Sequence, residues 1–271
     1  MADVRMPAGM IAWMQGLQWG AHHDEWHYTR RFDYWPHLAA HHPDPAARQE
    51  LAAMVQYAQA QGWKRAALQE GEPGSGLEFL IMHRAMFHLL LHQFPEAQHL
   101  LRGWHTPPQD PSDPDDPVGD GSSFDAAKAG GVAAIEAAAV HFQHEDDFGR
   151  FLETNIRPTA ADPTKRDPDA RLGVHNYLHN RWTDPTSDVN LGDPKVNIFN
   201  RRFWKLHGWI DHQWWRFRAA KGLADDATYV AALAHYRHMM SGHTHELAAS
   251  AVSDQPVIAR PAGFGRFFAF G

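Results

Sequence analysis

Apolar residues recur along most of the chain at the three- to four-residue spacing that is typical of amphipathic helices. The clearest case follows Asp44-Pro45, a capping residue and a proline suited to the first helical position, and it stops at Gly62. Its apolar positions are Leu51, Met54, Val55 and Ala58. The pattern predicts a helix over 45–62.

Further helices are predicted over 77–91, 125–143, 148–155, 171–181, 203–220 and 226–240. A weak strand signal is confined to Val257-Ile258. Two stretches rich in Pro and Asp, 105–123 and 156–171, read as solvated loops. We therefore expect an all-α fold, a single domain over 1–271 with a helical bundle core and long loops.

Composition narrows the chemistry. The chain has no Cys, which excludes disulfides, thiolate metal sites and cysteine nucleophiles, and its net charge of −7 with no basic block argues against nucleic acid as a partner. The first residues lack the apolar run of a secretory signal, and no apolar stretch is long enough to span a membrane, so we expect a cytoplasmic protein. The 21 His and 11 Trp are unusual. We expect the Trp-rich face of 203–220 to be core, with members Trp204, Trp209, Trp214 and Trp215.

The most informative histidines are His175 and His179, which lie four residues apart on a predicted helix. Their rings differ in direction by about 40°, so both can reach one metal ion. His207, on the next predicted helix, can complete a site of three imidazoles with open positions for another ligand. One or two such pairs are expected by chance in a chain this rich in His. The assignment of a metal site therefore depends on the residues that flank the pair.

Those flanking residues resemble the second copper motif of tyrosinases, catechol oxidases and related type 3 copper proteins. The matching residues are His175, Asn176 and His179 in an HNxxH pattern, and Phe203, His207, Asp211 and Trp214 in the closing helix. Many tyrosinases have two adjacent histidines where this chain has Leu206-His207. The resemblance covers about forty residues and implies that His175, His179 and His207 bind one copper ion. We expect Asp211, one turn beyond His207, to orient its ring.

The first copper site departs from the family. His83-Arg84 resembles the segment that carries the third ligand, but the usual position of the second ligand is Gly74. His23 and His27 repeat the four-residue spacing, and arthropod hemocyanins build both copper sites from such a pair plus one further His. We expect His23 and His27 to join His83, with His22 or the cluster 37–42 as competitors. His88 and His92 should point away, and the pairs His141/His144, His235/His238 and His243/His245 lack motif residues.

The resemblance implies two copper ions as cofactors, O2 as co-substrate, and oxidation or hydroxylation of a phenol, catechol or aminophenol. A peptide substrate and arylamine oxidation also occur within this class. Because the chain has no Cys to join a first-copper His through a thioether, a copper-delivery protein is a further candidate partner. Asn176 would help to hold the water that deprotonates a phenol. The alternatives are a hemocyanin-like dioxygen carrier and a copper- or zinc-binding protein without redox work. The Phe-rich end, 264–270, can be read as a pocket plug or as packing.

Overall fold

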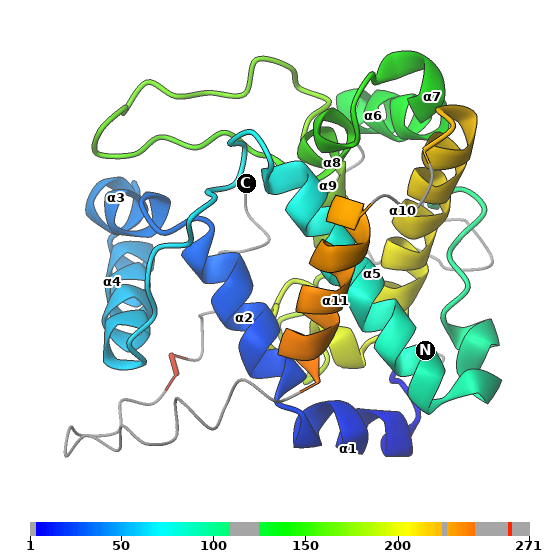
Figure 1. The fold of residues 1–271 in the computed structure, drawn as a ribbon. Helices are drawn as coiled ribbons and strands as arrows, with labels where there is room; N and C mark the ends of the chain where they lie inside the picture. The colour runs from blue at the N-terminus through cyan, green and yellow to red at the C-terminus, as the bar shows by residue number, and fades with distance from the viewer. Residues whose placement is uncertain (1–3, 109–124, 224–226, 242–259, 262–271) are drawn as a thin grey trace.

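The fold is built from helices, as the sequence predicts (Figure 1). The computed structural model describes residues 4–108, 125–223, 227–241 and 260–261. Within these ranges the β pairing is limited to one antiparallel bridge between Arg5 and Asn200. None of the helices in the described ranges has the length and apolar character needed to cross a membrane. The weak strand and the Phe-rich end lie outside the described residues.

Eleven α-helices and two short 3-10 helices make up the described part of the chain. They are α1 (Ala8–Gly16), α2 (Trp19–Thr29), α3 (Tyr34–His41), α4 (Pro45–Ala60), α5 (Ser75–Gln93), η1 (Pro95–Leu100), α6 (Ala126–Glu136), α7 (Ala138–His141), α8 (Glu145–Glu153), α9 (Val174–Arg181), η2 (Asn197–Phe199), α10 (Arg201–Ala220) and α11 (Ala227–Met240).

The predicted helices form close to their expected bounds, and their ends follow local chemistry. Asp44 caps α4 by accepting a hydrogen bond from the Ala46 N–H, and Gly62 ends that region in the left-handed conformation, with φ at 72°. The predicted helix over 125–143 is divided at Ala137 into α6 and α7. The pattern did not give the bounds of α1, α2 or α3, which have 9, 11 and 8 residues, so each offers few turns over which a period can be recognised.

Buried apolar side chains form two clusters, and α2 contributes to both. The larger one surrounds α5 and α10, while the smaller one joins α2 to the α3–α4 pair that lies to one side in Figure 1. Trp204, Trp209 and Trp214 are fully buried in the larger cluster, as predicted, whereas Trp215 is 60% exposed. The prediction for Trp215 is wrong because one residue rotates the side chain by about 100° around α10, away from the core face.

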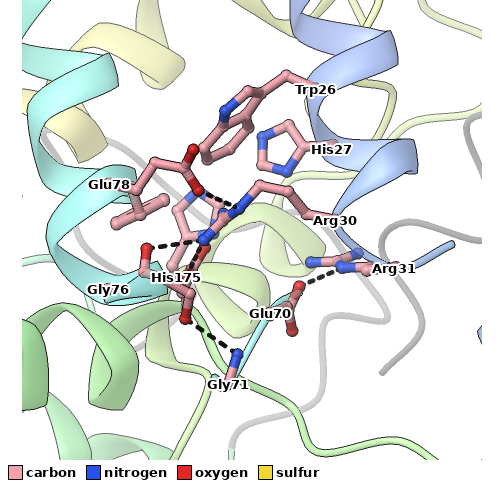
Figure 2. Close-up of polar contacts among 12 residues, drawn as sticks. Trp26, His27, Arg30, Arg31, Glu70, Gly71, Gly76, Glu78 and His175 are labelled. Carbon is pink, nitrogen blue, oxygen red and sulfur yellow. Dashed lines mark hydrogen bonds and ion pairs between the residues drawn. The ribbon is translucent and has the colours of Figure 1, made fainter. Parts of the chain in front are cut away.

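The guanidinium of Arg30, the residue that caps the C-terminal end of α2, ties that helix to two others. It donates to both carboxylate oxygens of Glu153, at 2.6 and 2.7 Å, and to the Ser75 carbonyl at 2.7 Å. Figure 2 shows it also reaching Glu78, at 3.1 Å, beside His27. The group lies over the Trp26 ring, 4.1 Å from its centroid. These contacts fix the spacing of α2, α5 and α8.

Two glycines let α5 and α8 cross in backbone contact. A Cβ on Gly76 would lie 2.2 Å from the Arg150 nitrogen, and a Cβ on Gly149 would lie 2.1 Å from the Gly76 oxygen. The Asp146 carboxylate, on α8, accepts hydrogen bonds from the Gly74 and Gly76 N–H groups, both at 2.9 Å. The first turn of α5 is therefore capped from the neighbouring helix.

We predict that Gly76→Ala lowers the free energy of unfolding by about 2–3 kcal/mol, because the added methyl group forces the two backbones apart. Gly9→Ala is the matched control, since Gly9 is also helical and a Cβ there would meet nothing within 4 Å. Chemical denaturation followed by circular dichroism measures both. Equal stability of the two variants would contradict the close crossing.

Candidate metal centre

Six buried histidines converge from four helices. The members are His23 and His27 on α2, His83 on α5, His175 and His179 on α9, and His207 on α10, all at most 7% exposed. In two groups of three, His23–His27–His83 and His83–His175–His207, the candidate ligand nitrogens lie within 4.8 Å of one another. His83 belongs to both groups, and its ring stacks on that of His207 at 4.0 Å. The six rings therefore form one cluster.

The Nε2 atoms of this cluster face inward. Nε2 of His23 and Nε2 of His27 are 3.1 Å apart. Nε2 of His207 lies 3.3 Å from Nε2 of His175 and 3.4 Å from Nε2 of His179. Nε2 of His83 is buried without a hydrogen-bond partner. Among these contacts, the inward Nε2 atoms meet only one another.

Backbone carbonyls fix the opposite side of three rings. Nδ1 of His23 contacts the Pro194 oxygen at 2.8 Å, Nδ1 of His83 the Phe79 oxygen at 2.8 Å, and Nδ1 of His179 the Leu191 oxygen at 2.7 Å. A carbonyl only accepts, so each Nδ1 carries the proton. In the neutral ring this leaves the Nε2 lone pair directed into the cluster.

The local backbone explains why these histidines arrive together. Gly173 opens α9 in the left-handed conformation, with φ at 76°, and its N–H donates to the Phe151 oxygen at the end of α8. A Cβ there would lie 1.7 Å from the Asn155 side-chain oxygen, so glycine is required at this position. The start of α9, and with it His175, is thereby set by α8.

Two phenylalanines enclose the cluster. The Phe203 ring lies 4.2 Å from that of His207 and 5.4 Å from that of His23, while the Phe79 ring lies 4.6 Å from His83 and 4.9 Å from His175. Both are fully buried. Phe203 was expected from the resemblance, and Phe79, one turn before His83, was not.

Burial keeps the histidines neutral. Desolvation lowers the pKa of His23 and of His179 from 6.5 to about 4, and the carbonyl contacts oppose this only in part. Burial, together with the neighbouring imidazoles, holds the pKa values of His27, His83, His175 and His207 well below the ordinary value. At neutral pH all six rings are therefore neutral, and each keeps one nitrogen lone pair.

This donor set fits metal ions. Two imidazole nitrogens that bind one tetrahedral ion at about 2.0–2.1 Å lie roughly 3.3 Å apart. The Nε2–Nε2 distances of 3.1, 3.3 and 3.4 Å match that spacing. Two facing nitrogens at this distance need a shared proton or a cation between them, because two lone pairs would repel. The spacing therefore makes the cluster a geometrically possible metal site.

The structure brings together all six histidines named as candidate copper ligands; that they bind copper stays a prediction. His22 is half-buried, unlike the six members of the cluster; His179, which is in neither group of three, joins the cluster through its contact with His207 at 3.4 Å. His88 and His92 are exposed, as expected. The other surface histidines, His41, His141, His144, His235 and His238, are exposed as well, and His243 and His245 lie outside the described residues.

One expectation needs revision. The expected bond between Asp211 and His207 is wrong: Asp211 accepts from Arg84 Nε at 2.6 Å, and Nδ1 of His207 is buried without a partner. The guanidinium of Arg84 draws the carboxylate away from the ring, and it also lies 3.7 Å over Trp214. The motif residues Asp211 and Trp214 therefore fasten α10 to Arg84 on α5.

Gly74, which stands at the family's usual position for the second ligand, lies directly before α5 with φ at 97°. This left-handed conformation favours glycine over a residue with a ligating side chain.

A small cavity lies beside histidines of α2 and α9. Its volume is about 20 Å³, and its lining includes His27, His175, His179, Asn176 and Arg31. Asn176 donates through Nδ2 to the Glu153 carbonyl at 3.0 Å and accepts from Arg31 Nη2 at 3.2 Å. Arg31 also pairs with Glu70, as Figure 2 shows. Asn176 thus lies beside the candidate ligands with its amide oxygen oriented.

Arg30 and Arg31 were not identified from the sequence. The signal was present for Arg30, which lies three residues after His27 and seven after His23 and so shares the face of α2 that carries both histidines. Arg31 carries no comparable periodic signal, because its role depends on α9 and on Glu70.

We predict that the metal-free protein loses stability as pH falls from about 6.5 toward 4, because the unfolded chain binds protons there that the buried histidines do not. Each such histidine lowers the free energy of unfolding by up to about 1.4 kcal/mol per pH unit. Stability from this source is fully present above pH 6.5. Urea titrations across this range measure the slope.

Two variants locate the source of that slope. His83→Gln should reduce it, whereas His88→Gln, on the exposed side of α5, should leave it unchanged. Identical slopes in both variants would show that the buried cluster does not titrate in this way.

Comparison with known proteins adds no assignment. No protein-family model matches the chain, and no curated protein matches it. The site therefore rests on the residues and distances above.

Proposed function

We propose that this protein is a copper-dependent oxidoreductase that activates O2 at a pair of copper ions and oxidises or hydroxylates phenols, catechols or aminophenols. The observation that carries the proposal is the cluster of six buried imidazoles whose Nε2 atoms converge at ligand spacing. The resemblance of 175–214 to the second copper motif of tyrosinases supports copper as the metal and the oxidation of phenols by O2 as the reaction.

In this proposal His23, His27 and His83 hold one copper ion, and His175, His179 and His207 hold the other. The contact between the His83 and His207 rings, at 4.0 Å, favours two neighbouring ions over two separate sites. Each set combines a four-residue pair on one helix with a single His from another.

The donor set favours copper. Neither histidine group contains a carboxylate, and the chain has no Cys. Mg²⁺, Ca²⁺ and Mn²⁺ prefer oxygen ligands, whereas neutral imidazoles suit copper and zinc. A zinc site of three histidines is the competing reading, and the tyrosinase-like motif favours copper over it.

When bound, such a copper pair supplies reversible binding and activation of O2. The chain contributes orientation and proton handling. Arg31 and the Glu153 carbonyl hold the Asn176 amide, whose oxygen keeps a second lone pair for a water or a substrate hydroxyl. Phe79 and Phe203 exclude water from the opposite side of the rings.

The cavity supports one alternative. Its volume of about 20 Å³ holds about one water molecule, which suits O2 better than an aromatic ring. A dioxygen carrier would need no more room. We favour the enzyme because the polar side chains of Asn176 and Arg31 line the same cavity. For an aromatic substrate to reach the site, the residues that line this cavity must move.

Metal content tests the ligand assignment. We expect the protein loaded with copper to hold two equivalents, and His207→Ala and His23→Ala each to lose about one, because a site of two imidazoles binds more weakly. His88→Ala is the control and should keep two. Two equivalents retained in both core variants, with circular dichroism intact, would overturn the assignment.

Reaction with O2 tests the redox proposal. Adding O2 to the Cu(I) protein should produce a strong near-ultraviolet band, and a catechol should then be oxidised to its quinone, measured by absorbance. A band without turnover on any phenol, catechol or aminophenol would favour the carrier. Binding of Zn²⁺ alone, with no band, would exclude both.

A further inference from the structure

One short segment, 190–197, holds a ligand from each set. Its Leu191 carbonyl accepts from Nδ1 of His179 at 2.7 Å, and its Pro194 carbonyl accepts from Nδ1 of His23 at 2.8 Å. The same segment lines the cavity with Leu191, Gly192, Pro194 and Asn197. The position of segment 190–197 therefore affects both ring orientations.

The segment is packed tightly against α2. A Cβ on Gly20 would lie 2.2 Å from the Lys195 oxygen, so the helix and the segment meet at backbone distance. Such contact brings Asp24 on α2 near Asp193 on the segment. Two buried carboxylates this close repel unless a cation separates them.

Arg260 supplies that cation from the far end of the chain. Residues 260–261 are the short red segment in Figure 1. The guanidinium donates to Asp24 Oδ2 at 2.9 Å and Oδ1 at 3.2 Å, and to Asp193 Oδ1 at 2.7 Å and Oδ2 at 3.1 Å. The side chain of Asp24 is 2% exposed, and those of Arg260 and Asp193 are 14% and 15% exposed.

We propose that Arg260 is a positioning residue for the first copper site: it clamps Asp193 to Asp24 and so holds the Pro194 carbonyl on His23. This inference rests on the proposed function for the identity of the metal. Asp24 follows His23 directly, and Asp193 precedes Pro194 directly. The two residues that Arg260 joins are therefore the immediate neighbours of the donor and the acceptor of the hydrogen bond from His23 Nδ1 to the Pro194 carbonyl. That hydrogen bond fixes His23 as the Nδ1–H tautomer.

The second site has separate support. The Asn190 side chain accepts from the Gly192 N–H at 3.1 Å and from the Asp184 N–H at 3.0 Å, and so joins the residues that flank Leu191 to a part of the chain that leads away from Asp193. Neither contact involves Arg260. Loss of the clamp should weaken the site of His23 much more than that of His179.

The test compares Arg260→Gln with the intact protein. Removing a group that orients a metal-bound histidine typically weakens affinity by 10–100-fold. We expect one copper to bind about 10–100-fold more weakly and the other to change less than about threefold, measured by competition with a chelator. Arg171→Gln, which removes an exposed arginine paired with Asp169, is the matched control and should change neither.

A rescue variant separates positioning from general stability. Asp24→Asn in the Arg260→Gln background removes the repulsion between carboxylates and should restore part of the lost affinity. Equal weakening of both copper sites, or a lower melting temperature with both affinities unchanged, would overturn the proposal.

A metal-free readout keeps this test independent of the proposed function. Nitrogen-15 NMR of the His23 ring, assigned through His23→Ala, should show protonated Nδ1 in the intact protein and mixed tautomers in Arg260→Gln. An unchanged His23 tautomer would reject the clamp even if copper binds, whereas absence of copper binding with the tautomer shift present would reject only the metal assignment.

Discussion

The burial of the Arg30 guanidinium constrains the arrangement of the helices that carry the histidines. A charged group in this setting must be paired, and removing one partner of a buried pair typically costs about 3–5 kcal/mol. Glu153 supplies the paired charge from the end of α8, and the Ser75 carbonyl receives a third bond at the start of α5. The backbone carbonyl of Glu153 also holds Asn176 on α9. Four elements of the site thus meet at one ion pair.

Much of the candidate site could be predicted from the sequence because its histidines follow helical geometry. A four-residue spacing places two rings on one face, and in the structure the rings of both pairs, His23/His27 and His175/His179, lie in contact. The supporting contacts depend on chain segments distant in sequence. The bonds from His23 to Pro194 and from Arg260 to Asp24 have no periodic signal. Asp211 shows the same limit, since its partner was set by the neighbouring helix.

The fold was predictable to a similar extent. Long helices with a clear apolar face, such as α4 and α10, and the strongly apolar α5 lie close to their predicted bounds. The packing between helices was harder to predict from the sequence, because close crossings require glycines at matching positions on both partners. The contact of Gly76 with α8, like that of Gly103 with Gly208, requires bare backbone on both partners, and an isolated glycine in a sequence does not identify its partner.

The carbonyl-bound imidazoles have a consequence for the order in which the protein matures. Because three Nδ1 atoms are already bonded and the pKa values lie below neutrality, ion uptake at the proposed copper sites would require neither deprotonation nor rotation of these rings. Under that proposal the binding site is complete once the chain has folded, unlike a zinc finger, which folds around its ion. The rate of metal loading would then depend on access through the cavity that segment 190–197 helps to line.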